Sequence, residues 1–148
     1  MFLSYVLSFV NVGIDWNNHH HMFHAVKHVG GWVLWANLHL LFWLSLMPFA
    51  TAFLGKNHFA PVTIAVCAAD LMMCAIAYTM LVMALTAEHG AGSEFARVLG
   101  SDRKGKVSPA AYALSIPLAF VSPWISGAVL VAGTLIWIVP DRRFAKGA

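Results

Sequence analysis

A block of polar side chains directly follows an apolar stretch near the start of the chain. Phe2–Ile14 reads as an apolar helix, and the next residues, Asp15–His24, carry one carboxylate, two amides and four imidazoles. Such groups bind metals, relay protons or form hydrogen-bond networks. Polar groups at membrane depth are costly unless they are paired or hydrated, so this block is the first candidate for a functional site.

The histidines allow two kinds of cofactor chemistry. His20, His24 and His28 recur every four residues, the helical spacing that chelates zinc or nickel, but no Cys or carboxylate cluster accompanies them. His20 or His39 could ligate haem in a helical bundle. Packed, hydrogen-bonded or solvated histidines are the more ordinary explanation, so we expect no metal and no cofactor. A haem- or metal-binding membrane oxidoreductase subunit remains the alternative function.

The polar block divides between two faces of its helix. At 100° per residue one face carries Asn11, Asp15, Asn18 and His19, and roughly the opposite face carries Asn17, His20, His21, His24 and His28. A helix end that is polar all round emerges into water or is surrounded by partners. A second candidate is Asp70, which lies some ten residues inside a later apolar run. As an intramembrane acid it must pair, bind a proton or face water.

The composition indicates what must position these groups. The chain is 60% hydrophobic and 10% charged, far from the roughly 25% charged residues of soluble domains. No Asp, Glu, Lys or Arg lies between Lys27 and Lys56, Phe59–Ala87 is interrupted only by Asp70, and Pro109–Val139 carries no charge. A helix needs about 20 apolar residues to cross the hydrocarbon core. The sequence therefore predicts an all-α integral membrane protein.

We predict a single transmembrane domain, a bundle of five helices at about 2–26, 31–54, 60–86, 109–120 and 123–139. A break at Ser122–Pro123 leaves Lys56 alone on one side and all other Lys and Arg on the other. The positive-inside rule then places the protein in the cell membrane with its N-terminus outside. The loop 88–107 and the tail 140–148 are cytoplasmic, and in the loop we expect Ser93 to cap a short helix with Phe95, Val98 and Leu99 facing the bilayer.

Other classes of function find little support. The chain has no Gly-rich phosphate loop, nucleophile elbow or H-E-x-x-H motif, so we do not expect an enzyme. Its net charge of +3 comes from Lys and Arg in the predicted cytoplasmic segments and does not indicate a nucleic-acid-binding surface. A start outside the membrane with an odd number of helices suggests a six-helix protein that lacks its first helix. The alternative is a natural five-helix protein inserted with its N-terminus outside.

Several blocks resemble the bacterial transmembrane protein 175 family of potassium channels. They occur in the family's order over nearly the whole chain: Gly13–Phe23, Leu34–Leu38, Met47–Thr51, Ile116–Trp124 and Val139–Arg143. The resemblance implies six helices per repeat, homotetrameric assembly in the lipid bilayer, and passive K⁺ flux through a central pore. One departure matters, because the family's first helix carries an arginine followed by Phe-Ser-Asp and supplies the pore gate. No Phe-Ser-Asp occurs here, so no gate residue is assigned.

The same resemblance implies roles for individual residues. His19 and His20 are expected to hydrogen-bond with the first helix and with Asn37 on the following helix, as an inter-helix polar network. Trp16 either joins this network or only packs. The expected function is therefore a potassium channel subunit, with K⁺ as the permeant ion and other copies of the chain as its partners.

Overall fold

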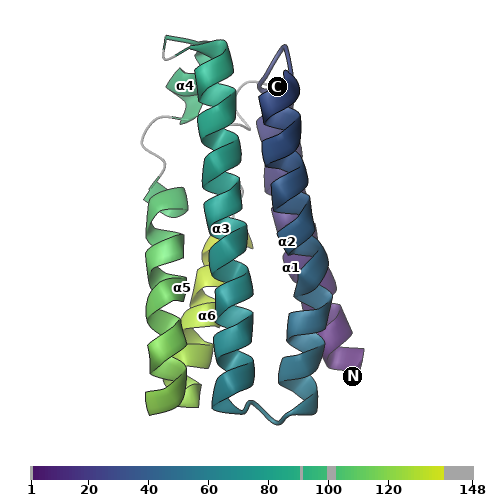
Figure 1. The fold of residues 1–148 in the computed structure, drawn as a ribbon, viewed down its shortest axis with the longest axis vertical. Helices are drawn as coiled ribbons and strands as arrows, with labels where there is room; N and C mark the ends of the chain where they lie inside the picture. The colour runs from purple at the N-terminus through teal and green to yellow at the C-terminus, as the bar shows by residue number, and fades with distance from the viewer. Residues whose placement is uncertain (1, 91, 100–102, 139–148) are drawn as a thin grey trace.

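The computed structural model describes residues 2–90, 92–99 and 103–138, and within these ranges the chain is helical and contains no strand (Figure 1). The end of the last predicted span and the predicted tail 140–148 lie outside the described residues. The elements are α1 (Phe2–His24), α2 (Gly31–Lys56), α3 (Pro61–His89), α4 (Glu94–Leu99), α5 (Arg103–Val121) and α6 (Pro123–Ile138). The prediction of an all-α fold is confirmed.

Helix α3 lies at the centre of the bundle. It packs against α2, α5, α6 and α4, while α1 packs on α2 and reaches α6 (Figure 1). Its buried surface includes the small side chains Ala68, Cys74, Ala75 and Ala77. Small side chains let neighbouring helices approach closely where no hydrophobic effect drives them together, as in a membrane.

Two helices are clearly long and apolar enough to span a membrane. These are α2, with 26 residues, and α3, with 29. Val107–Val121 in α5 and Pro123–Trp137 in α6 are apolar but shorter. Large apolar side chains also cover the outside of the bundle, including Trp32, Val121 and Trp124, each more than 80% exposed. That all five long helices cross the membrane remains a prediction.

Proline sets the start of two helices. Pro61 stands in the first turn of α3, where its missing N–H costs no hydrogen bond. Pro123 does the same for α6, directly after Ser122, which separates it from α5. The Ser122 N–H still donates to the Leu118 carbonyl at 2.8 Å. The break at Ser122–Pro123 that the charge pattern favoured is therefore present.

Helix α5 begins earlier than the sequence suggested. The predicted span began near residue 109 and the preceding segment was expected to be a loop, but α5 runs from Arg103 with Pro109 in its interior. A proline inside a helix leaves the carbonyl four residues earlier without its usual donor. Here that carbonyl belongs to Gly105, and it lies 3.3 Å from the Thr79 hydroxyl of α3. The same hydroxyl lies 2.9 Å from the Ala75 carbonyl of its own helix, so the two carbonyls share its single hydrogen.

The short helix α4 is capped as expected, but its Phe95 side chain faces the core of the bundle instead of the bilayer. The Ala96 N–H donates to Ser93 Oγ at 3.1 Å, which is an N-cap interaction. Phe95, however, is 1% exposed and packs with the hydrophobic core beside His89. The prediction that Phe95 faces the bilayer is therefore wrong, because α4 folds back on the end of α3. The side chain of Val98 lies outside the described part.

The connection between α1 and α2 is held against the end of α3. His28 Nε2 lies 3.4 Å from Glu88 Oε1. Gly30 passes so close that a Cβ there would lie 2.6 Å from the same oxygen. A glycine is therefore needed at position 30 for the Glu88 carboxylate to reach this loop.

Candidate functional site

A hydrogen bond joins the polar block of α1 to α2. The ring N–H at His19 Nε2 donates to Asn37 Oδ1 at 2.5 Å, and both side chains are half-buried. The imidazole also lies against the Phe23 ring, with centroids 4.6 Å apart. Of the four residues expected in the inter-helix network, these two are brought together.

Trp16 and His20 form a separate pair on the outside of α1. Their rings stack with centroids 5.1 Å apart and planes 13° apart. The Trp16 side chain is 61% exposed, and His20 continues the row by meeting His24 edge-on at 4.5 Å. Neither contacts Asn37 in the described residues. Their predicted part in the network would therefore need a partner outside this bundle.

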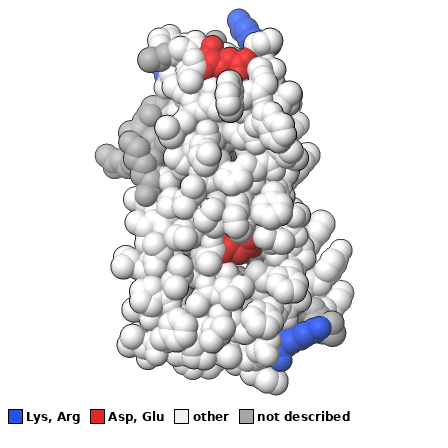
Figure 2. All heavy atoms as spheres, in the orientation of Figure 1, with Lys and Arg blue, Asp and Glu red and all other residues white. Residues whose placement is uncertain are grey.

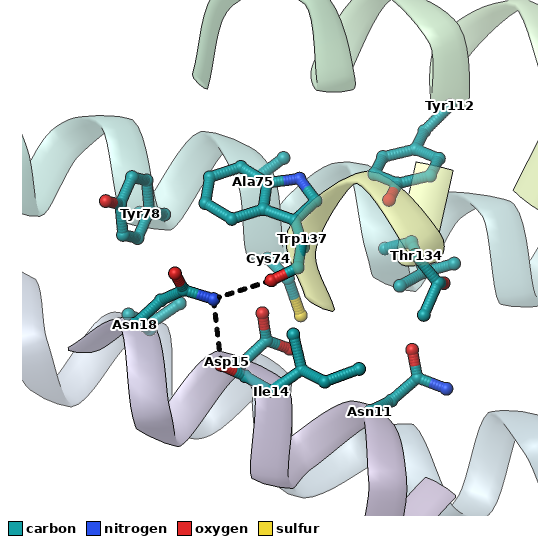
Figure 3. A pocket seen from close by; sticks show the side chains of 12 residues that line it. Asn11, Ile14, Asp15, Asn18, Cys74, Ala75, Tyr78, Tyr112, Thr134 and Trp137 are labelled. Carbon is teal, nitrogen blue, oxygen red and sulfur yellow. Dashed lines mark hydrogen bonds between the residues drawn. The ribbon is translucent and has the colours of Figure 1, made fainter. Parts of the chain in front are cut away.

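The other face of α1 lines a cavity inside the bundle (Figure 3). It has a volume of about 40 Å³, space for two or three water molecules. Asn11, Asp15 and Asn18 come from α1, Cys74 and Tyr78 from α3, Tyr112 from α5, and Thr134 and Trp137 from α6. The spacing of the α1 residues in the sequence had already placed them on one face. Their partners on α5 and α6 carried no signal in the sequence.

Asn18 anchors α1 to the end of α6. Its Nδ2 donates to the Ile14 carbonyl at 2.9 Å and to the Trp137 carbonyl at 3.0 Å (Figure 3). The Trp137 indole N–H in turn donates to Ser108 Oγ on α5 at 2.9 Å. The wall of the cavity therefore fixes α1, α5 and α6 relative to one another.

Asp70 lies in the interior and has no hydrogen-bond partner among the described residues. Its side chain is 6% exposed, and neither carboxylate oxygen receives a hydrogen bond from the described part of the chain. It stands one helical turn before Cys74, which lines the cavity. Asp15 on α1, which sequence reasoning noted only as part of a polar face, lines that cavity together with Cys74. The two acids form the second polar feature of the bundle.

The histidines show no arrangement for a metal or haem. Among residues 2–90, 92–99 and 103–138, no three His, Cys, Asp or Glu side chains group together as a metal site would require. The Trp43 indole N–H donates to His39 Nε2 at 3.0 Å, which occupies the nitrogen that would ligate a haem iron. Cys67 and Cys74 are buried free thiols.

The His19–Asn37 bond can be measured by a double-mutant cycle on stability in detergent. We expect a coupling energy of about 0.6 kcal/mol, up to about 1.7 kcal/mol, between His19→Ala and Asn37→Ala, the range of hydrogen bonds between membrane helices. The same cycle with His20→Ala is the control, because His20 contacts only Trp16, His21 and His24 rings in the described residues. Equal coupling in both cycles would contradict the assignment.

A family model and a known protein match this chain. The family model described as "Endosomal/lysosomal potassium channel TMEM175" matches residues 1–48, which include α1, most of α2 and the His19–Asn37 pair. A protein named as a potassium channel, from Chryseobacterium sp. (strain P1-3), is 46% identical over 145 residues, covering 98% of this chain and 76% of that protein. No solved structure matches the chain.

Proposed function

Since the chain belongs to the TMEM175 family of potassium channels, we propose that it acts as a homotetramer that carries K⁺ passively across the membrane along a path between its copies. Members of a channel family are not enzymes, so the alternative of a haem- or metal-binding oxidoreductase is dropped. K⁺ is the permeant ion. The polar groups of the bundle then hold the helices in register beside the path.

The size of the cavity is the observation that carries this proposal. Its volume of about 40 Å³ holds two or three water molecules, whereas a conduction path must cross some 30 Å of hydrocarbon. Most of the described bundle interior is close-packed, with Leu81, Leu85, Met47 and Ile64 at most 1% exposed. A path between copies of the chain avoids this core. It also gives a role to the outward-facing Trp16 and His20.

The apolar outer surface supports a bundle immersed in lipid. The exposed side chains of α2 include Trp32, Trp35, Phe42 and Phe49, each more than half exposed. Inside the bundle, the buried Ser126 hydroxyl of α6 donates to the Ser115 carbonyl of α5 at 2.7 Å and so joins two helices. An outer surface of apolar side chains suits a solvent that cannot hydrogen-bond.

Potassium flux from liposomes tests the proposal. The complete protein is reconstituted into KCl-loaded vesicles, and K⁺ efflux into a K⁺-free medium is followed with a pH-sensitive dye and a protonophore. Flux above that of empty vesicles is expected, with a mass of four chains by native mass spectrometry. Folded protein without flux would overturn the channel proposal, and a flux-competent monomer would overturn the path between copies.

The orientation of the chain is a separate prediction. Lys56 ends α2 at the turn into α3. Lys27 follows α1 and Arg97 lies on α4, and both of these segments adjoin the C-terminal end of α3. Figure 2 shows basic atoms at both ends of the visible face. By the positive-inside rule, we propose five crossings with Lys56 outside and the C-terminus in the cytoplasm. In a background with Cys67 and Cys74 replaced by alanine, an impermeant maleimide should label Asn57→Cys on intact cells. Gly92→Cys should be labelled only after permeabilisation.

The two labelling sites are matched in exposure. Asn57 and Gly92 are both exposed, so accessibility in the folded chain does not distinguish them. Labelling of Gly92→Cys but not of Asn57→Cys on intact cells would reverse the orientation. Labelling of both would show that these two turns lie on the same side of the membrane, which contradicts the proposed crossings.

A further inference from the structure

The two interior acids have no positive partner in the described bundle. Lys27 follows α1, Lys56 ends α2 and Arg97 lies on α4, so these basic residues belong to the ends of the bundle. Figure 2 shows acidic atoms midway along one face with no basic atoms beside them. Asp70 is 6% exposed with both oxygens unpartnered, and Asp15 is half-buried at the cavity. An uncompensated charge in such an interior costs several kcal/mol. A positive charge close to these two acids is therefore needed to compensate them.

Three neutral side chains offer oxygen acceptors to the cavity beside these acids, in addition to the hydroxyls of Tyr78 and Tyr112 that also line it. The Asn11 amide nitrogen donates to the Leu7 carbonyl at 3.0 Å, and the Asn18 amide nitrogen donates to two carbonyls. The Thr134 hydroxyl donates to the Leu130 carbonyl at 3.1 Å. Asn18 and Thr134 donate their side-chain hydrogens to backbone carbonyls, and Asn11 donates one of its two, so the side-chain oxygens of all three can accept. Together with the Asp15 carboxylate they make a wall rich in oxygen ligands.

Oxygen ligands of this kind select hard cations. Carboxylate, carbonyl and water oxygens suit ions such as alkali and alkaline-earth metals, and thiolate or imidazole ligands would suit softer ones. The volume of about 40 Å³ accommodates one such ion with one or two waters. The other titratable groups near the acids are the thiols Cys67 and Cys74 and the phenols Tyr78 and Tyr112, none of which supplies a positive charge.

We propose that an alkali-metal cation, K⁺ or Na⁺, binds in this cavity beside Asp15 and Asp70 within each protomer. The ion contacts Asp15 and Asn11 of α1 and Thr134 of α6, and so ties these helices together. Its charge also offsets that of Asp70, which stands one turn before the cavity-lining Cys74 but does not itself line the cavity. A single proton would neutralise one acid and leave the free oxygens of Asn11 and Thr134 without a role. The site lies inside one bundle, so its occupancy does not depend on conduction between copies.

Thermal unfolding of the purified protein in detergent tests this site. The melting temperature is measured against KCl or NaCl, with N-methyl-D-glucamine chloride keeping the ionic strength constant at pH 7.5. We expect a saturable increase with K⁺ or Na⁺. Asp15→Asn and Asp70→Asn should each raise the half-saturating concentration at least about tenfold, equivalent to about 1.4 kcal/mol. Glu88→Gln, at the end of α3, should leave it unchanged.

A second pair of variants keeps the test decisive if an aspartate variant does not fold. Asn11→Leu removes a neutral oxygen from the cavity and should raise the half-saturating concentration several-fold, whereas Asn17→Leu on another face of α1 should not. Three outcomes would overturn the proposal: no difference among the cations, stabilisation by low pH alone, which would indicate a proton, or a cation response that persists in every cavity variant. Because unfolding is measured without flux, failure here leaves the channel proposal standing.

Discussion

Replacing Trp137 with alanine is expected to lower the free energy of unfolding by about 3 kcal/mol, as removal of a large packed aromatic side chain usually does. The indole connects three helices. It stands on α6, donates a hydrogen bond to Ser108 on α5, and meets the Tyr78 ring of α3 edge-on with centroids 5.1 Å apart. The substitution would enlarge the cavity at its wall and leave Ser108 without this donor. The measurement is the midpoint of unfolding in detergent or in SDS.

Trp124 on the same helix is the matched control. It is 82% exposed, and its ring contact is with Phe59 at a centroid distance of 6.4 Å. Trp124→Ala should therefore cost less than about 1 kcal/mol. If the two alanine variants were destabilised equally, the indole of Trp137 would not be the anchor of α6 that its contacts indicate.

The helical architecture could be predicted because its signals are local. Long apolar runs require backbone hydrogen bonds within each segment, and prolines such as Pro123 mark helix starts by their fixed geometry. Helix α5 was misjudged for the opposite reason. Whether Pro109 ends or merely interrupts a helix depends on packing, since the Gly105 carbonyl lies 3.3 Å from the Thr79 hydroxyl on another helix. A contact between segments far apart in the sequence leaves no pattern within either one.

The same distinction applies to the site. Helical periodicity placed Asn11, Asp15 and Asn18 on one face of α1, and family resemblance suggested the pairing of His19 with Asn37. Periodicity could not give the opposite wall of the cavity, since Tyr112 and Thr134 face α1 only through the packing of α5 and α6. Apolar spacing in α4 likewise could not distinguish a helix facing lipid from one folded back on the core.

A glycine on α6 provides the second large effect. A Cβ at Gly133 would lie 2.7 Å from Cε1 and 2.8 Å from the hydroxyl of Tyr112, a side chain that is 3% exposed. Because the buried ring has little room to move, Gly133→Ala should separate α5 from α6 locally and destabilise the protein by roughly 1–3 kcal/mol. The midpoint of thermal unfolding should therefore fall. The increase in this midpoint with K⁺ or Na⁺ should also become smaller, because Tyr112 lines the cavity.

Gly127→Ala on the same helix is the control, because it measures the effect of replacing a helical glycine with alanine where no clash occurs. A Cβ at Gly127 would meet nothing within 4 Å, so Gly127→Ala should stabilise the protein by up to about 1 kcal/mol through helix propensity alone. If Tyr112 is the obstacle, Gly133→Ala should lose most of its cost in a Tyr112→Ala background, where the ring is absent. A cost that stays the same in that background would mean that α6 is constrained at Gly133 by something other than the approach of α5.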